Sequence, residues 1–350
     1  MSGILKLAII GTGAVANEAH FPYWRKIPGI KVTSVCDVNR AAAENTARRW
    51  QVPGTYSNIS ELFKTEKPDI VDICTPPNTH LPIIAQAIEV GCHIICEKPL
   101  AMNLEDTRKI EELYQNRPNQ AAKFNIAYSM LYHPQFLALL EKIARKDAGD
   151  ILNIEIKCLH PDNEEMLANP KHWCHTLPGG RLGETIVHPI YMLYKIVGEL
   201  RLRDVYLTKH GSYSWVKYDE LKVSFDTDHG FAGFYVSFNS PGLEYPLVTI
   251  DGTKGHILLN GHNHTLIETH PTQGNGMFSR GTDSLMQIGK TAGSLARNSI
   301  RALTLRHKPG HRKFLELFVT DIGGRGNMPV TTEEAFAINR IFLSLLERIS

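Results

Sequence analysis

Short apolar runs alternate with helix-compatible stretches along the first third of the chain, as expected when buried strands are joined by helices. The expected strands cover Leu5 to Ile10, Ile30 to Cys36, Asp69 to Cys74, His93 to Cys96 and Lys123 to Tyr128. The expected helices cover Ala41 to Trp50, Leu81 to Val90, and Leu104 to Gln115 with Asn103 as its N-cap. This alternation predicts an α/β domain of the Rossmann type, with a doubly wound parallel sheet.

The pattern changes after a helix predicted from Pro134 to about Lys146. Strand-like runs follow at Ile151 to Leu159, Val205 to Lys209, Leu221 to Phe225, Phe231 to Phe238, Leu247 to Ile250 and His256 to Leu259. The turn signals Asp228-His229-Gly230 and Asp251-Gly252 suit antiparallel hairpins. We therefore expect a second, α+β domain with an open, mainly antiparallel sheet. The predicted division is 1–123 for dinucleotide binding and 124–350 for substrate binding and oligomerisation.

Composition narrows the class of protein. With 350 residues, 43% of them hydrophobic, the chain can bury a sizeable core. A net charge of +2 requires neither nucleic acid nor a membrane as partner. No run approaches the roughly 18 apolar residues of a membrane span, and the first residues lead straight into a strand, so a cytoplasmic protein is expected. The six cysteines show no paired spacing for a metal and are expected to be reduced and structural.

The first strand runs directly into a glycine-rich turn with the G-x-G-x-x-A pattern of dinucleotide-binding proteins. This run is Gly11-Thr12-Gly13-Ala14-Val15-Ala16. The first glycine permits the tight turn, the second lets the backbone approach a pyrophosphate, and the alanine allows close packing of the next helix. Asp37 ends the second strand 24 positions after Gly13, near the spacing of about 20 expected for an acid that binds the adenine ribose. Its charge favours NAD over NADP, although Arg40 leaves NADP open; a turn residue is the structural alternative.

A lysine stands where the strand from His93 to Cys96 ends. Lys98 lies between Glu97 and Pro99, at the sheet edge where such folds perform their chemistry. An ammonium group there can exchange a proton with a substrate hydroxyl, and the proline biases the lysine toward an extended conformation. Taken alone, a solvated lysine at a strand end would be the better interpretation, and the motifs that follow favour the catalytic one.

A second candidate group follows the glycines Gly179 and Gly180. Glu184 and His188 are four residues apart, so on one helix they share a face. His188 could then move a proton near neutral pH, with Glu184 orienting it or holding a substrate hydroxyl. The pair could bind zinc, but no third ligand with suitable spacing is evident, so no metal is expected. A helix N-terminal acid beside a hydrogen-bonded histidine is the structural alternative.

The combined pattern resembles the Gfo/Idh/MocA oxidoreductases, which include inositol dehydrogenases and glucose–fructose oxidoreductase. Besides the glycine turn and Asp37, the resemblance rests on Glu97-Lys98-Pro99, on the Gly-Gly turn leading to Glu184 and His188, and on the run Thr75-Pro76-Pro77-Asn78-Thr79-His80. It implies an NAD(P) cofactor whose nicotinamide and ribose lie near Thr75, Pro77, Asn78, His80, Glu97 and Lys98. It also implies oligomerisation through the C-terminal sheet, as a homodimer or homotetramer.

The resemblance further implies a substrate pocket lined by Glu184 and His188, with Arg181 in the same run. Trp173 and His175 are similar to residues often found before the Gly-Gly turn, although a core tryptophan is the alternative. Glu184 replaces the family's usual aspartate, and the arginine that many relatives carry is not seen between residues 128 and 133. Both departures reshape the predicted pocket.

The residues and the resemblance together predict reversible hydride transfer between nicotinamide and a secondary alcohol of a sugar or cyclitol. His188 is expected to take the proton while Lys98 polarises the oxygen and Glu184 holds a neighbouring hydroxyl. A non-catalytic NAD(P)-sensing protein and an NAD-recycling epimerase or lyase are the alternatives.

The basic segment from Phe278 to Lys313 is interpreted as a solvated or subunit-contacting amphipathic helix. An anionic-substrate clamp and a membrane-surface contact are the other interpretations.

Overall fold

The computed structural model describes residues 3–243, 245–270, 285, 288–289, 291–293 and 309–350. The chain divides into two compact units. The first unit comprises Met1–Tyr132 and His307–Leu343, and the second comprises His133–Arg306 and Ser344–Ser350. This grouping places 307–343 with the N-terminal part, whereas the predicted domains were 1–123 and 124–350. The functional division between those two domains stays a prediction.

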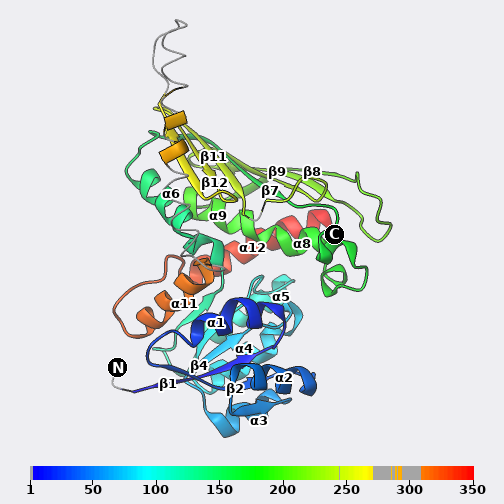
Figure 1. Cartoon of the computed structure of the whole chain (residues 1–350), viewed down its shortest axis with the longest axis vertical. Helices are drawn as coiled ribbons and strands as arrows, with labels where there is room; N and C mark the ends of the chain where they lie inside the picture. The colour runs from blue at the N-terminus through cyan, green and yellow to red at the C-terminus, as the bar shows by residue number, and fades with distance from the viewer. Residues whose placement is uncertain (1–2, 244, 271–284, 286–287, 290, 294–308) are drawn as a thin grey trace, which may run out of the picture. The chain divides into compact units, whose positions relative to one another are not determined.

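The first unit is built on a parallel sheet, as the sequence predicted, and this sheet has six strands where five were expected (Figure 1). The strands are β1 (Leu5–Ile10), β2 (Ile30–Cys36), β3 (Gly54–Tyr56), β4 (Ile70–Ile73), β5 (His93–Cys96) and β6 (Phe124–Ile126). Their order in the sheet is β3-β2-β1-β4-β5-β6. Every residue of β4 is buried, as expected for a central strand covered on both faces.

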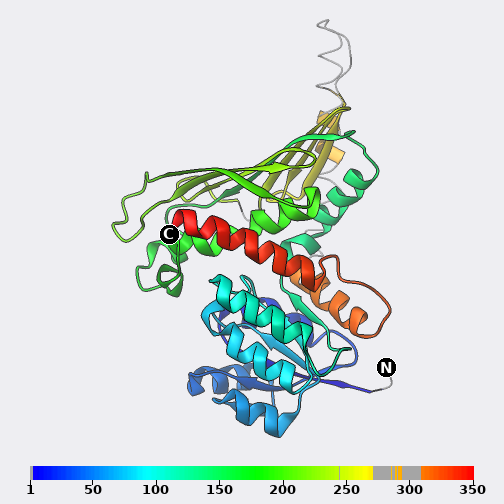
Figure 2. The same cartoon turned by 180° about the vertical axis from the view of Figure 1, so that it is seen from behind.

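Helices flank this sheet on both faces. The helical elements of the unit up to α11 are η1 (Ala16–His20), α1 (Phe21–Trp24), α2 (Arg40–Trp50), α3 (Ile59–Glu66), η2 (Pro77–Thr79), α4 (His80–Glu89), α5 (Leu104–Gln115), η3 (Ser129–Tyr132) and α11 (Pro309–Ile322). Helix α4 contacts both α3 and α5. Helices α4 and α5 lie in front of the sheet in Figure 2, whereas α1 lies in front of it in Figure 1, which is the opposite view. Asn103 caps α5 as predicted, its side chain accepting the backbone N–H of Asp106 at 2.7 Å.

The register of the parallel strands aligns their carboxyl ends. Ile10 of β1 pairs with Cys36 of β2 on one side and with Ile73 of β4 on the other. Ile73 in turn pairs with Cys96 of β5. The residues that follow these strands therefore emerge at one edge of the sheet. The chain turns outward in opposite directions from β1 and β4, and this switch point is where doubly wound sheets bind ligands.

The second unit contains a sheet of seven strands in the order β13-β12-β11-β7-β10-β9-β8. The strands are β7 (Ile151–Leu159), β8 (Arg201–Thr208), β9 (Glu220–Thr227), β10 (Gly230–Ser237), β11 (Leu247–Gly252), β12 (His256–Asn260) and β13 (Thr265–Thr269). Strands β7 and β10 are parallel and the other neighbours are antiparallel. The predicted, mainly antiparallel sheet is confirmed.

Helices pack on this second sheet at two places. Helix α6 (Pro134–Ala144) contacts β12 and β13, and α9 (Val187–Val197) contacts β7 and β10. The remaining elements of the unit are α7 (Glu165–Ala168), η4 (Trp173–Thr176), α8 (Gly180–Thr185) and the end of α12 (Thr332–Ile349).

Three further expectations concern the chain as a whole. All six cysteines are free and buried. Among the described residues, no helix has both the length and the apolar character needed to cross a membrane. The predicted basic helix between Phe278 and Lys313 falls largely outside the described residues, and its role stays a prediction.

Candidate functional site

The glycine turn after β1 has the geometry that its sequence implies. Gly11 has φ +91°, and a Cβ there would lie 2.6 Å from the Cys74 carbonyl oxygen, so only glycine fits. Gly13 is exposed, and a Cβ there would meet nothing within 4 Å. The helix begins at Ala14, so the unsatisfied N–H groups of its first turn border this open space, as in anion-binding helix termini.

Asp37 holds the glycine turn from the end of β2. Its Oδ2 accepts hydrogen bonds from the backbone N–H and the hydroxyl of Thr12, at 2.8 and 2.9 Å, and its Oδ1 accepts the N–H of Asn39 at 2.9 Å. A carboxylate offers about four lone-pair positions, so capacity remains for a ribose hydroxyl. Arg40 is exposed and donates to Glu44 at 3.0 Å, one turn along α2. The turn, the helix terminus and Asp37 therefore fit a dinucleotide.

The loop after β4 holds the predicted nicotinamide-side residues. Asn78 is exposed and Pro77 buried, both in η2, and Thr75 accepts a hydrogen bond from the hydroxyl of Thr79 at 2.8 Å. His80 is wholly buried, with its ring nitrogens 2.9 Å from the Thr75 carbonyl and 3.0 Å from the Leu100 carbonyl. Burial lowers the pKa of His80, and its backbone hydrogen bonds oppose that shift. This histidine ties the loop after β4 to the one after β5.

Lys98 lies half-buried just beyond β5, at the same sheet edge as the glycine turn. Its peptide bond to Pro99 is cis. The neighbouring Glu97 is buried, and its Oε2 accepts the backbone N–H of Lys98 at 3.2 Å. The carboxylate of Glu97 thus contacts the main chain that carries the candidate catalytic lysine.

A buried cluster beneath this edge was missed by the sequence analysis. We call it the His20 cluster, and it comprises Trp24, His20, Asp72 and Glu97. The ring nitrogens of His20 lie 2.8 Å from Asp72 Oδ2 and 2.9 Å from Glu97 Oε1, and Trp24 Nε1 donates to Asp72 Oδ2 at 2.5 Å. An acid inside the apolar strand Ile70–Ile73 was the signal that could have revealed it, because a buried carboxylate needs a partner.

Electrostatics within the His20 cluster favour the charged forms. Burial alone would lower the pKa of His20, but the negative charge of Asp72 and its hydrogen bond raise this pKa well above the ordinary value. Burial would likewise raise the pKa of Glu97, but the hydrogen bond and charge of His20 lower it to about 2. These directions favour a protonated His20 beside an ionised Glu97.

The other candidate residues belong to the second unit and follow a tight turn. Gly179 and Gly180 have φ values of +70° and +56°, and a Cβ at Gly183 would lie 2.1 Å from the Pro178 carbonyl oxygen. Helices α8 and α9 are separated by Ile186, which keeps right-handed helical angles. The single helix predicted to carry both Glu184 and His188 is thus interrupted at Ile186.

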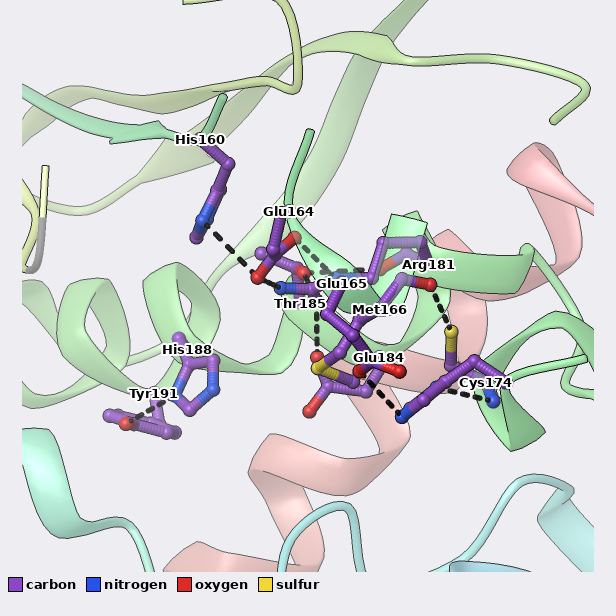
Figure 3. A network of polar contacts seen from close by, with 11 residues as sticks. His160, Glu164, Glu165, Met166, Cys174, Arg181, Glu184, Thr185, His188 and Tyr191 are labelled. Carbon is purple, nitrogen blue, oxygen red and sulfur yellow. Dashed lines mark hydrogen bonds and ion pairs between the residues drawn. The ribbon is translucent and has the colours of Figure 1, made fainter. Parts of the chain in front are cut away.

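Arg181 organises a buried ion network, shown in Figure 3. Its Nε and NH2 groups donate to the two carboxylate oxygens of Glu164 at 3.0 and 2.7 Å. Its NH1 group donates to Glu184 Oε2 at 2.5 Å and also to the hydroxyl of Thr185. The guanidinium carbon lies 4.9 Å from the ring centroid of Phe238. Arg181 is only 6% exposed, so this geometry supports a role in orienting Glu184.

The remaining predicted pocket residues also lie in the second unit. His188 Nδ1 is 2.7 Å from the hydroxyl of Tyr191, which is wholly buried (Figure 3). Trp173 is 40% exposed, which argues against the core position considered as its alternative. His175 is partly buried, and its Nε2 has no hydrogen-bond partner among the described residues. The substrate-binding roles of these residues stay predictions.

Two groups of side chains within the His20 cluster and its surroundings have donor atoms close enough to hold a metal ion. They are His20 with Glu97 and His311, and His20 with Asp72 and Cys74. Both groups require His20, whose ring nitrogens already lie at hydrogen-bond distance from carboxylates.

The N-terminal part of the chain is similar to known oxidoreductases. The family described as oxidoreductases with an NAD-binding Rossmann fold matches residues 5–123. A D-glucoside 3-dehydrogenase of Escherichia coli is 33% identical over 109 residues, which are 31% of this chain and 31% of that protein. An inositol 2-dehydrogenase of Paracoccus denitrificans is 26% identical over 191 residues, covering 54% of this chain and 53% of that protein. The matches thus span 31% and 53% of the lengths of these two relatives.

Solved structures show the same fold over nearly the whole chain. The WlbA dehydrogenase of Bordetella pertussis, in complex with NADH and UDP-GlcNAcA, has a TM-score of 0.79 at 15% identity, covering 99% of this chain and 96% of that one. The scyllo-inositol dehydrogenase of Lactobacillus casei, with bound NAD(H) and scyllo-inositol, has a TM-score of 0.74 at 16% identity, covering 98% and 96%. Residues 5–123 thus match the family of oxidoreductases with an NAD-binding Rossmann fold, the Gfo/Idh/MocA family that the sequence pattern resembles.

Proposed function

We propose that this protein is an NAD-dependent dehydrogenase acting on a secondary alcohol of a sugar, a cyclitol or a derivative of one. The observation that carries the proposal is the alignment of Gly11, Asp37 and Glu97 at one edge of the parallel sheet, around its switch point. The relatives named as glucoside and inositol dehydrogenases support the substrate class.

The cofactor would be held by groups already in place in the first unit. The helix terminus after Gly13 suits a pyrophosphate, and Asp37 suits the hydroxyls of the adenine ribose. A ribose 2′-phosphate would meet the negative charge of Asp37, while Arg40 is engaged with Glu44. We therefore favour NAD over NADP. When bound, the nicotinamide would supply the hydride acceptor.

The proton chemistry is assigned to three residues on the basis of the sequence. Lys98 would polarise the substrate oxygen, His188 would take the hydroxyl proton and Glu184 would hold a neighbouring hydroxyl. For His188 to accept a proton at Nε2, its Nδ1 must carry the other hydrogen and donate it to the Tyr191 oxygen, 2.7 Å away. Arg181 supports the assignment of Glu184, because its guanidinium keeps a carboxylate oxygen in a fixed position.

The decisive experiment monitors NADH absorbance with the full-length protein, NAD and a panel of inositols, free hexoses, glucosides, sugar phosphates and nucleotide sugars. Reduction of NAD by one class is the expected result and identifies the substrate. Tight NADH binding with no turnover of any compound would instead support the sensing alternative. Conversion of a sugar without net NADH would support the recycling epimerase or lyase.

Light scattering of the purified protein tests the predicted homodimer or homotetramer. A monomer at working concentration would contradict the prediction that the open sheet of the second unit serves oligomerisation.

A further inference from the structure

His20 has no part in the glycine turn, in the binding of ribose or in the proposed proton transfer, yet it is wholly buried. Both of its ring nitrogens face carboxylate oxygens, at 2.8 Å from Asp72 and 2.9 Å from Glu97. An ionised carboxylate only accepts hydrogen bonds, so each ring nitrogen must donate one. A histidine that donates from both nitrogens is the imidazolium cation.

The surroundings of His20 hold this cation from several elements. Asp72 on β4 also receives the Trp24 indole N–H at 2.5 Å and the Cys74 thiol at 3.6 Å. His311 on α11 lies edge-on to His20, with ring centroids 5.7 Å apart. Asp72, with its indole donor, anchors one side of the imidazolium at the centre of the sheet.

Glu97 connects the other side of the imidazolium to the candidate catalytic segment. One oxygen of its carboxylate meets His20 Nε2 at 2.9 Å, and the other accepts the backbone N–H of Lys98 at 3.2 Å. A continuous chain of polar contacts thus runs from β4, through His20 and Glu97, to the main chain of Lys98.

We infer that His20 is a positioning residue, a buried cation anchored on Asp72 that fixes the Glu97 carboxylate and, through it, the backbone of Lys98. The effect on turnover rests on the proposed dehydrogenase function. The charge of the ring and its link to Lys98 do not depend on that function and can be measured in the protein without cofactor.

The π-helical turn at Ala16–His20 gives His20 its place. Its first residue, Ala16, is the last of the glycine-rich run, and its last residue is His20 itself. π-Helical turns are rare and are often found at functional sites. Here the turn delivers a histidine from the helix of the dinucleotide fingerprint to the carboxylates of β4 and of the segment after β5.

The first test uses nuclear magnetic resonance of the full chain labelled with ¹⁵N-lysine. The Lys98 amide is assigned by its loss in Lys98→Arg. His20→Gln is expected to shift this amide clearly, because Glu97 loses its cationic partner. Trp24→Phe is the matched control, since it removes a donor to Asp72 in the same cluster and should leave the Lys98 amide close to its wild-type position. An unchanged Lys98 amide in His20→Gln would overturn the link.

The second test reads the charge of the ring directly in wild-type protein labelled with ¹⁵N-histidine. Two protonated ring nitrogens are expected for His20 above neutral pH, assigned by their shift in Glu97→Gln. A ring with a single N–H would overturn the inference, and this measurement stands even where His20→Gln fails to fold. Stoichiometric zinc in the purified protein, bound through His20, would also overturn it, because a ligating nitrogen carries no proton.

Kinetics then separate this inference from the proposed function. His20→Gln is expected to lower kcat by about 10- to 100-fold, as displaced catalytic groups do, while the dissociation constant of NADH changes by less than about threefold. Wild-type kcat in His20→Gln would overturn the positioning role. A wild-type protein that neither binds NADH nor turns over any substrate would refute the proposed function and leave the two resonance tests intact.

Discussion

The Asp37 carboxylate binds Thr12 twice, accepting its backbone N–H at 2.8 Å and its hydroxyl at 2.9 Å. The acid predicted to bind the adenine ribose therefore also shapes the glycine turn in front of it. A nucleotide would meet a turn whose conformation is already fixed, so little ordering of the backbone would oppose binding.

Asp37→Ser should weaken NAD binding and reduce the preference for NAD over NADP. Loss of charged hydrogen bonds to the ribose is expected to cost about 1.5–3 kcal/mol of binding free energy, whereas the repulsion of a 2′-phosphate disappears. Titration of both reduced cofactors by fluorescence measures the two dissociation constants. Thr12→Val is the control, because it removes one hydrogen bond to Asp37 and keeps the carboxylate. Equal NAD affinity in Asp37→Ser and wild type would contradict the assignment of Asp37.

His188→Ala should reduce turnover by about 10²- to 10⁴-fold, the usual contribution of acid–base catalysis, and leave NADH affinity largely intact. Tyr191→Phe removes the hydroxyl 2.7 Å from His188 Nδ1 and should have a smaller effect of the same kind. Steady-state kinetics with the substrate identified above provide the measurement. Unchanged turnover in His188→Ala would exclude His188 as the base.

Combining Lys98→Met with His188→Ala tests whether the two residues act on one oxygen. Residues that act as a unit give strongly non-additive losses. The double variant is then expected to lose little more than the worse single variant. Losses that multiply would show that the two residues act independently.

Arg181→Met should destabilise the protein by about 3–5 kcal/mol, because it leaves the buried carboxylate of Glu184 and the half-buried one of Glu164 without their cation. Urea unfolding gives the change in the free energy of unfolding. Arg201→Met is the control in the same unit, since the pair of Arg201 with Asp228 is exposed and no measurable change is expected. A stability of Arg181→Met equal to that of the control would show that the network contributes little.

The His20 cluster predicts a specific dependence of stability on pH. Its histidine has a pKa raised in the folded chain, so its charge contributes fully below about pH 6.5, the ordinary value. Above that pH the folded chain retains one more proton than the unfolded chain, and the free energy of unfolding falls by about 1.4 kcal/mol per pH unit until the folded pKa is passed. The depressed pKa of Glu97 acts in the opposite range, because its contribution is lost only as the pH falls toward about 2.

Urea unfolding of wild type and His20→Gln at several pH values above 6 checks this dependence. The stability advantage of wild type should shrink as the pH rises, whereas Trp24→Phe should follow the wild-type slope. A constant difference between wild type and His20→Gln would show that the ring has no raised pKa.

Sequence patterns were sufficient for elements with a strong local signal. The strand Leu5–Ile10 and the helix Leu104–Gln115 were predicted to the residue, because an apolar run and an asparagine cap mark them locally. The strand Gly54–Tyr56 was missed, since its three half-buried residues carry no alternation. The parallel pairing of β10 with β7 was missed too, because turn signals predict pairing only between strands that follow one another along the chain.

In the candidate site, too, contacts between residues close in sequence were predictable and contacts between distant residues were not. The glycine turn and Asp37 follow from spacing within one βαβ unit, and the structure brings them into direct contact. The bonds of His20 reach across 52 and 77 residues, and no local pattern specifies such partners. Arg181 was grouped with the substrate pocket because it stands in the right run, but its partner Glu164 lies 17 residues away and becomes apparent only when the chain is folded.

Strand β7 is the first strand of its sheet to be synthesised, yet it lies in the middle, between β10 and β11. During translation its pairing with both neighbours is therefore complete only after residues 160–252 have emerged. Both of its edges lack a partner strand for much of that interval. The second unit should consequently mature slowly and depend on chaperones more than the first, whose strands find partners soon after they appear.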